Sequence, residues 1–122
     1  MSIMIKNCST IFFTNNRMET LNYYRKLGFH VDDDFGFVER EGLAVIFHEA
    51  SRNEILRNYP YHGEHALDIY CMVSDAEELY NEFVSSGAII HKALIITGFN
   101  LKEFSIMDPS GFTIGFGQSL ID

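Results

Sequence analysis

The sequence contains an internal repeat, and no other feature constrains the fold as strongly. A helix-like segment at 17–27 ends at Gly28, and a second helix-like segment in the other half of the chain ends at Gly87. Tyr24 and Phe83 occupy matching places in the two segments, and both pairs are 59 positions apart (83 − 24 and 87 − 28). Each half alone is too small to bury a sheet, so the repeat predicts two modules that fold together.

Each half predicts the order strand, helix and three further strands. One helix is expected after an asparagine N-cap, and the other is expected from Ser74 or Asp75 to about residue 86. Apolar, β-branched and aromatic runs indicate the strands. The expected strands are 3–14, 29–31, 35–39 and 43–49 in the first half, and 66–73, 88–91 and the two arms of a final hairpin in the second, with 93–100 as a loop or an edge strand.

The two modules cover about residues 1–50 and 64–122. A polar connector at about 51–63 joins them, and residues 53–57 within it could form one helical turn. We therefore predict an α+β fold in which two βαβββ modules make a single domain over residues 1–122.

The final hairpin is marked by the turn sequence Asp-Pro-Ser-Gly at 108–111. Closing the hairpin at the two ends of this turn would pair Ile106 with Thr113 and Phe104 with Gly115, all on one face of the sheet. Strand alternation would then turn the next set of side chains to the other face, namely Phe112, Ile114 and Phe116.

Strand alternation also predicts an inner sheet surface that is aromatic and apolar. Phe35 and Phe37 fall on this surface, and its polar members are Ser9, His48, Asp68 and Tyr70. A concave apolar surface with few polar groups suits a small-molecule site. Two inner faces packed together as a core are an equal alternative. A buried Asp68 would need a partner, such as His48 or a ligand cation, unless the strand shifts by one residue and turns it to solvent.

Composition excludes several classes of function. The net charge of −8 argues against nucleic-acid binding, which needs clustered Lys and Arg. No apolar run reaches the roughly 18 residues that a membrane span requires, and no signal-peptide pattern is present, so a cytoplasmic location is expected. Cys8 and Cys71 lie in apolar runs and are expected to be small buried side chains, not a disulfide or a metal site.

Three segments give the chain a family resemblance. The runs NNRMETLNYYRKLGF, DIYCMVSDAEELYNEFVSSGA and EFSIMDPSGFTIGFGQ, in their βαβββ order, resemble the vicinal-oxygen-chelate superfamily of glyoxalases, bleomycin-resistance proteins and extradiol dioxygenases. The DPSG hairpin is most similar to the bleomycin-resistance branch. The resemblance implies that the two modules pair into a curved mixed sheet. It also implies a homodimer whose grooves lie between halves of different subunits.

The resemblance also implies where metal ligands would lie in enzymes of the superfamily. The matching positions in this chain are Ser9, Ile46, Asp68 and Gly115, and His48 lies two residues from one of them. Zn²⁺, Fe²⁺ or Ni²⁺ sites need about three ligands from His, Cys or carboxylate. Asp68 is the only one of the four matching residues whose side chain is such a ligand. No metal and no other cofactor is therefore expected.

The resemblance therefore favours a metal-free protein that sequesters a cationic or aromatic small molecule, and favours it over an enzyme. The expected ligand-binding residues are Phe35, Phe37, His48, Asp68, Tyr70, Phe104 and Ile106. One alternative is a metal-dependent lyase or dioxygenase that uses Asp68 and His48. Another is an interaction module whose cavity is closed.

Overall fold

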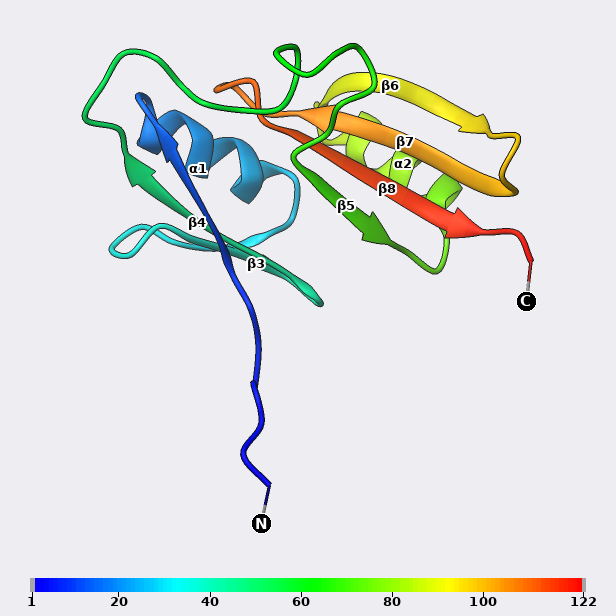
Figure 1. Ribbon diagram of the computed structural model, residues 1–122, viewed down its shortest axis with the longest axis horizontal. Coiled ribbons are helices and arrows are strands. Elements are labelled where there is room, and N and C mark those ends of the chain that lie inside the picture. Colours follow the sequence, from blue (N-terminus) through cyan, green and yellow to red (C-terminus); the bar gives the residue numbers. More distant parts are fainter. Residues whose placement is uncertain (1, 122) are drawn as a thin grey trace. The chain divides into compact units, whose positions relative to one another are not determined.

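The computed structural model describes residues 2–121, and it consists of two compact units. The N-terminal unit is Met1–Ile55 and the C-terminal unit is Leu56–Asp122. Each unit contains a four-stranded mixed sheet with one helix, as Figure 1 shows. This arrangement confirms the predicted α+β fold with two βαβββ modules. No helix among residues 2–121 is long and apolar enough to cross a membrane.

The N-terminal unit has the strand order β1-β4-β3-β2. β1 runs parallel to β4, and the other neighbouring strands are antiparallel. Its elements are β1 (Thr10–Thr14), α1 (Arg17–Lys26), β2 (His30–Asp32), β3 (Phe37–Arg40) and β4 (Leu43–Glu49).

The C-terminal unit repeats this topology with the strand order β5-β8-β7-β6. β5 runs parallel to β8, and the remaining pairs are antiparallel. Its elements are β5 (Ile69–Met72), α2 (Ala76–Ser85), β6 (Ile89–Ile96), β7 (Leu101–Met107) and β8 (Thr113–Ser119). The internal repeat seen in the sequence is thus a repeat of structure.

Local capping chemistry explains both helix starts. The side chain of Asn16 accepts a hydrogen bond from the backbone N–H of Glu19, and Asp75 accepts one from Glu78 in the same way. Both helices end before a glycine with positive φ, 90° at Gly28 and 87° at Gly87. The predicted caps are confirmed because they depend on signals within one turn of the chain.

Each helix covers one face of its own sheet, and aromatic side chains fill the interface. In the N-terminal unit, Tyr24 of α1 stacks on Phe47 of β4 with ring centroids 5.4 Å apart. In the C-terminal unit, Phe83 of α2 contacts Phe104 and Phe116 at centroid distances of 6.1 and 5.4 Å. All five side chains are buried, so these clusters are the cores of the two units.

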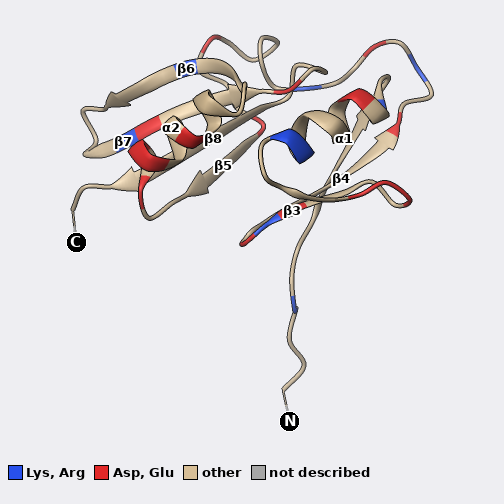
Figure 2. Cartoon of the chain, turned by 180° about the vertical axis from the view of Figure 1, so that it is seen from behind, with Lys and Arg blue, Asp and Glu red and all other residues tan. Residues whose placement is uncertain are grey.

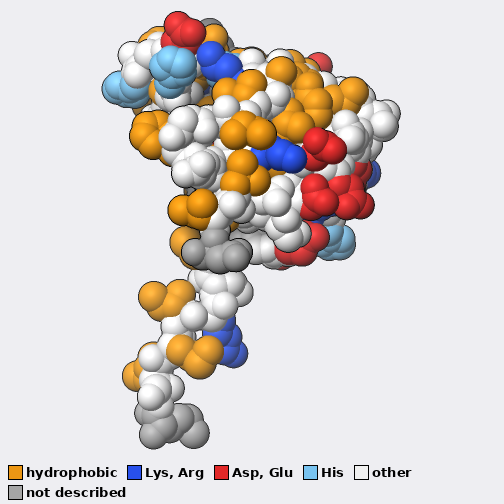
Figure 3. Space-filling view, turned by 90° about the vertical axis from the view of Figure 1, so that its right-hand side faces the viewer, with side chains coloured by type: hydrophobic (Ala, Val, Ile, Leu, Met, Phe, Trp, Pro, Cys, Tyr) orange, Lys and Arg blue, Asp and Glu red, His pale blue; other side chains and the backbone are white. Residues whose placement is uncertain are grey.

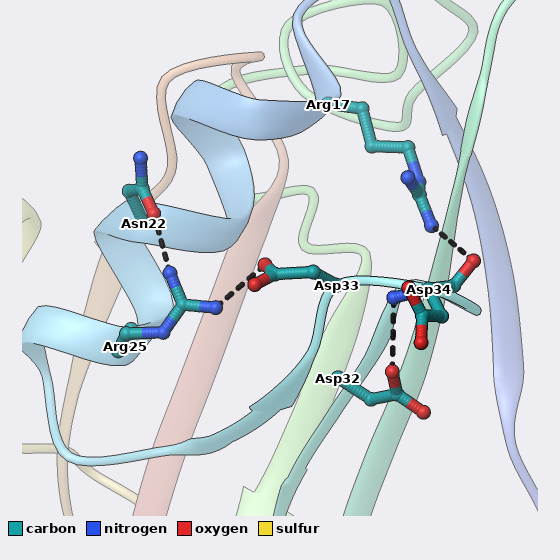
Figure 4. A network of polar contacts seen from close by, with 6 residues as sticks. All are labelled: Arg17, Asn22, Arg25, Asp32, Asp33 and Asp34. Atoms are coloured by element: carbon teal, nitrogen blue, oxygen red, sulfur yellow. Dashed lines mark hydrogen bonds and ion pairs between the residues drawn. The ribbon is translucent and has the colours of Figure 1, made fainter.

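Two arginines tie α1 to the turn before β3, as Figure 4 shows. Arg25 forms an ion pair with Asp33, with Nη2 2.6 Å from the carboxylate oxygen. Arg17 donates to the backbone carbonyl oxygens of Asp34 and Phe47. Figure 2 shows basic residues at the end of α1 and acidic residues at the start of α2, as helix dipoles favour.

The first predicted strand is too long. Residues 3–9 are not part of a strand, because the pairing of β1 with β4 begins only at Thr10 opposite Val45. The apolar side chains of this segment are almost fully exposed, 103% for Ile3 and 89% for Ile5, and Figure 3 shows such side chains in orange. Cys8 is exposed, so the prediction that it is buried was wrong.

Three other boundaries also differ from the prediction. Residues 53–57 form no helical turn. Residues 88–91 and 93–100 are not two separate segments, because β6 runs continuously over Ile89–Ile96 with two shifts in register. β6 is the edge strand of its sheet, which agrees with the edge-strand alternative for the first part of 93–100. β5 covers only Ile69–Met72 of the predicted strand 66–73.

The predicted pairing of the final hairpin is wrong by one residue. Ile106 pairs with Ile114 and Phe104 with Phe116, whereas Thr113 pairs with Met107. The cause lies in the turn. A side-chain oxygen of Asp108 accepts hydrogen bonds from the N–H groups of Ser110 and Phe112, and the backbone of Asp108 bonds to that of Phe112. The loop therefore has three residues, and its last one, Gly111, has φ 90°. A shift of one residue exchanges the two faces of a strand.

Candidate functional site

Each sheet has one face turned away from its helix, and we call this the open face of that unit. In the N-terminal unit it includes Ile11, Phe37 and Ile46, which pair across β1, β4 and β3. Phe13 and His48 form the next pair, with ring centroids 5.5 Å apart. Ile11 and Phe13 are each 53% exposed. The open face of the N-terminal unit is therefore an accessible apolar surface.

Phe35, a predicted ligand residue, is not part of a strand. It lies in the turn at 33–36 before β3 and is 66% exposed. Phe37 and His48 do lie on the open face of the N-terminal unit, as the alternation of β3 and β4 predicted.

The open face of the C-terminal unit is built around Tyr70. Tyr70 of β5 pairs with Gly115 of β8, and Gly117 follows two residues later on the same face. A Cβ at Gly115 would lie 2.9 Å from the Tyr70 ring, and one at Gly117 would overlap the hydroxyl. The two glycines thus allow the tyrosine ring to lie flat along β8. Tyr70 is still 44% exposed.

The hydroxyl of Tyr70 reaches across β8 to Glu103 of β7. It donates a hydrogen bond of 2.5 Å to a carboxylate oxygen of Glu103. Partial burial, this hydrogen bond and the charge of Glu103 together raise the pKa of Tyr70 to about 12. The phenol therefore stays protonated at neutral pH, and the carboxylate is held in place beside an aromatic ring.

Asp68 lies just before β5, and its side chain is bonded within the C-terminal unit. One carboxylate oxygen accepts a hydrogen bond of 2.8 Å from the backbone N–H of Asn58. The other accepts from the N–H and the hydroxyl of Thr113, at 2.9 and 3.1 Å. Asp68 thus fastens the segment before β5 to the start of β8, which accounts for a carboxylate at this half-buried position.

The corrected register moves two predicted ligand residues. Phe104 and Ile106 are 2% and 0% exposed, and both lie on the face of β7 that packs against α2. Phe104 contacts Tyr80 of α2 at a centroid distance of 5.2 Å. Gly115 is therefore not beside Phe104, as the predicted register implied, but on the opposite face under Leu67 and Tyr70.

The residues that match the superfamily's metal positions do not fit a metal. Ile46 has no atom that could bind a metal. Leu67 and Tyr70 cover Gly115 and occupy the space that a ligand there would need. The oxygens of Asp68 already accept hydrogen bonds. Among residues 2–121, no group of three or more His, Cys, Asp or Glu side chains could hold a metal ion.

Sequence reasoning missed three residues of the C-terminal unit. Glu103 and Ser105 lie on the open face, where the predicted register had instead placed Phe104 and Ile106. His91, which was not among the predicted ligand-binding residues, lies where the register of β6 shifts against β7. The Asp-Pro-Ser-Gly-Phe sequence at 108–112 could have indicated the observed register of β7 and β8, because it also fits a three-residue loop.

Comparison with known proteins decides the family. The family model for the Glyoxalase/Bleomycin resistance protein/Dioxygenase superfamily matches residues 9–116. The chain belongs to this superfamily. The resemblance of the three sequence segments is thus confirmed. No match is found among curated protein sequences.

Several solved structures share the fold of this chain. A bleomycin resistance determinant encoded on the transposon Tn5 has a TM-score of 0.68 and 20% identity, with 96% of this chain and 100% of that chain covered. A glyoxalase/bleomycin resistance protein/dioxygenase from Alicyclobacillus acidocaldarius has a TM-score of 0.71 and 17% identity over 96% and 93%. TioX from Micromonospora sp. ML1 has a TM-score of 0.69 and 17% identity over 95% and 100%.

Proposed function

We propose that this protein binds a small aromatic or cationic molecule without a metal ion and so sequesters it. The observation that carries this proposal is the chemistry of the two open faces. Both present exposed aromatic side chains, Phe13 and Tyr70, although aromatic side chains are usually covered by a partner or by the core. Solved relatives include a protein named a bleomycin resistance determinant.

The electrostatic part of the proposal rests on Glu103. Asp68 was the expected anionic residue, but its oxygens already accept hydrogen bonds from Asn58 and Thr113. Glu103 accepts a hydrogen bond from Tyr70 at one oxygen, and it carries its charge beside an exposed ring. A flat cation stacked on Tyr70 would meet both the ring and the carboxylate.

The ligand-binding residues in this proposal are Phe37 and His48 in the N-terminal unit, and Tyr70 and Glu103 in the C-terminal unit. Phe35 stays a candidate because it is exposed near β3. Phe104, Ile106 and Asp68 support the site from within the C-terminal unit. A homodimer, as the family resemblance implies, is part of the same proposal, and so is the cytoplasmic location expected from the sequence.

Calorimetric titration with bleomycin tests the proposal, with Glu103→Gln as the first variant. Removing the carboxylate charge while keeping its shape is expected to weaken binding roughly two- to fivefold, the value of a solvent-accessible ion pair. Glu78→Gln is the matched control, because Glu78 lies on α2, at the opposite face of the C-terminal sheet. Binding that is unaffected by Glu103→Gln would contradict the assigned role of Glu103.

Elemental analysis of the purified protein separates this proposal from the metal-dependent lyase or dioxygenase. The proposal expects no stoichiometric Zn, Ni, Mn or Fe. A metal at one equivalent per chain, retained after dialysis against a chelator, would overturn the metal-free mechanism even if bleomycin binds.

A further inference from the structure

Two buried polar side-chain atoms in the part of the chain at 2–121 have no hydrogen-bond partner. They are Nε2 of His91 and Oγ of Ser105. Ser105 is only 2% exposed, although it lies on the open face of the C-terminal sheet. An unpartnered buried polar atom is unfavourable, so such atoms in a native fold usually mark a place where a water molecule or a ligand binds.

The two side chains come from neighbouring strands at one point of the sheet. Ile90 pairs with Ile106, and the next pair is Lys92 with Ser105. His91 is therefore the extra residue of a β-bulge, so that His91 and Lys92 together oppose Ser105. Bulges redirect side chains, and they are frequent beside functional sites.

The segment that leads into β5 covers this point of the sheet. Tyr59 packs edge-on against the His91 ring at a centroid distance of 4.4 Å, and Glu64 pairs with Lys92 at 3.6 Å. His91 and Lys92 thus both point toward residues 59–64. Figure 1 shows this segment, in green, at the end of the sheet where β7 continues into β8.

A second contact of the same segment reaches the centre of the open face. Leu67 lies over Gly115, with its Cδ1 2.6 Å from where a Cβ of Gly115 would be. Gly115 is in turn the β8 residue that pairs with Ser105. The segment 59–67 therefore roofs the open face beside Ser105, which explains how a residue of that face becomes buried.

The two unpartnered side chains, those of His91 and Ser105, are uncharged. Burial and the nearby Lys92 lower the pKa of His91, so its imidazole is neutral at pH 7. A neutral imidazole has one donor and one acceptor nitrogen, and a serine hydroxyl both donates and accepts. The charge of Lys92 is balanced by Glu64. A ligand group that both donates and accepts, and has no charge, fits this environment.

We propose that His91 and Ser105 bind an uncharged hydrogen-bonding group of the ligand, such as a carboxamide, beneath the segment 59–67. This inference rests on the proposed ligand-binding function, and it specifies where the polar end of the ligand binds. Ser105, Gly115 and Tyr70 pair in one row across β7, β8 and β5. Leu67 lies over Gly115, between the other two residues, so an aromatic carboxamide that binds at Ser105 and reaches Tyr70 would displace the Leu67 side chain.

Three probes of one shape test the inference: benzamide, benzoate and benzamidinium, which are neutral, anionic and cationic. Binding is followed by the imidazole NMR signals of His91 and by titration. Benzamide is expected to shift the His91 signals, whereas the charged benzoate and benzamidinium are expected to leave them unchanged. Ser105→Ala is expected to weaken benzamide roughly three- to tenfold, the value of one hydrogen bond, and to leave benzoate and benzamidinium unchanged.

Two further variants keep the test sharp. His91→Phe retains a ring against Tyr59 but removes both nitrogens, and it should weaken benzamide by a similar factor. Ser85→Ala on the exposed side of α2 is the matched control and should change nothing. Circular dichroism of each variant verifies that the fold is retained.

The outcomes separate this inference from the proposed function. In one outcome, all three probes shift the ring signals of Tyr70 equally while the binding of none depends on Ser105 or His91. That result would show that the assignment of the polar end of the ligand to these two residues is wrong, whereas the proposed binding of an aromatic molecule would stand. The same conclusion follows if the two atoms hold only a bound water that benzamide does not displace. If neither bleomycin nor any probe binds, the proposed function itself fails.

Discussion

The two units share one topology, yet the equivalent rows of their open faces differ in chemistry. In the N-terminal unit the row across three strands is Ile11, Ile46 and Phe37. The equivalent row in the C-terminal unit is Tyr70, Gly115 and Ser105. One row is three apolar side chains, whereas the other is a tyrosine folded over a glycine beside a buried serine.

The next rows differ in the same way. Phe13 pairs with His48 in the N-terminal unit, and Met72 pairs with Gly117 in the C-terminal unit, next to Glu103. The repeat preserves the faces that pack against the helices, because both units need a core. The open faces are free of that requirement. The comparison teaches that an aromatic surface and a polar one can be built on the same framework.

The largest expected effects concern what the units have in common. Tyr24→Ala and Phe83→Ala each remove the aromatic side chain that joins a helix to its sheet, and both side chains are almost fully buried. Each variant should lose about 3–5 kcal/mol of unfolding free energy. Chemical denaturation measures this. A loss of unfolding free energy below about 1 kcal/mol in one of the two variants would show that the two cores are not equivalent.

A second pair of variants tests where the units diverge. Gly115→Val places a side chain where Leu67 and Tyr70 already lie, and should cost about 1–3 kcal/mol as they are displaced. Ile46→Val, at the equivalent place in the N-terminal unit, only trims a half-buried side chain and should cost less than about 1.5 kcal/mol. A smaller cost for Gly115→Val than for Ile46→Val in denaturation would contradict the close packing of Tyr70 on the glycines.

A smaller effect is expected at high pH and only in the C-terminal unit. The pKa of Tyr70 is raised to about 12 by burial and by Glu103. Because the pKa is higher in the folded state, the stabilisation is fully present below pH 10 and is lost as the pH rises through 12. The phenolate absorbance of the protein minus that of Tyr70→Phe gives this titration. In Glu103→Gln the transition should move toward pH 10, and an unchanged midpoint would exclude Glu103 as a cause.

The sequence predicted the features that depend on short-range signals. The caps at Asn16 and Asp75, the glycines after both helices and the repeat itself all follow from residues within one turn or from a fixed spacing. The open face of the N-terminal unit was predicted because the alternation of side chains along β3 and β4 places Phe37 and His48 on one face, whichever residues pair across the turn.

The features that were not predicted depend on shifts of one residue in the pairing of two strands. The side chain of Asp108 lengthens the final turn by one residue, and this exchanges Phe104 for Glu103 and Ser105 on the open face. The bulge at His91 is equally invisible to strand alternation. An apolar run also cannot show where its pairing partner begins, which is why the first strand was predicted too long.

Chemical-shift mapping of a bleomycin titration tests the central claim most directly. The account predicts the largest shifts on the open faces, above all at Tyr70, Glu103 and Gly115, with the α2 residues that cover the other side of the sheet little changed. Shifts confined to α1 and α2, or no shifts at any accessible concentration, would contradict it.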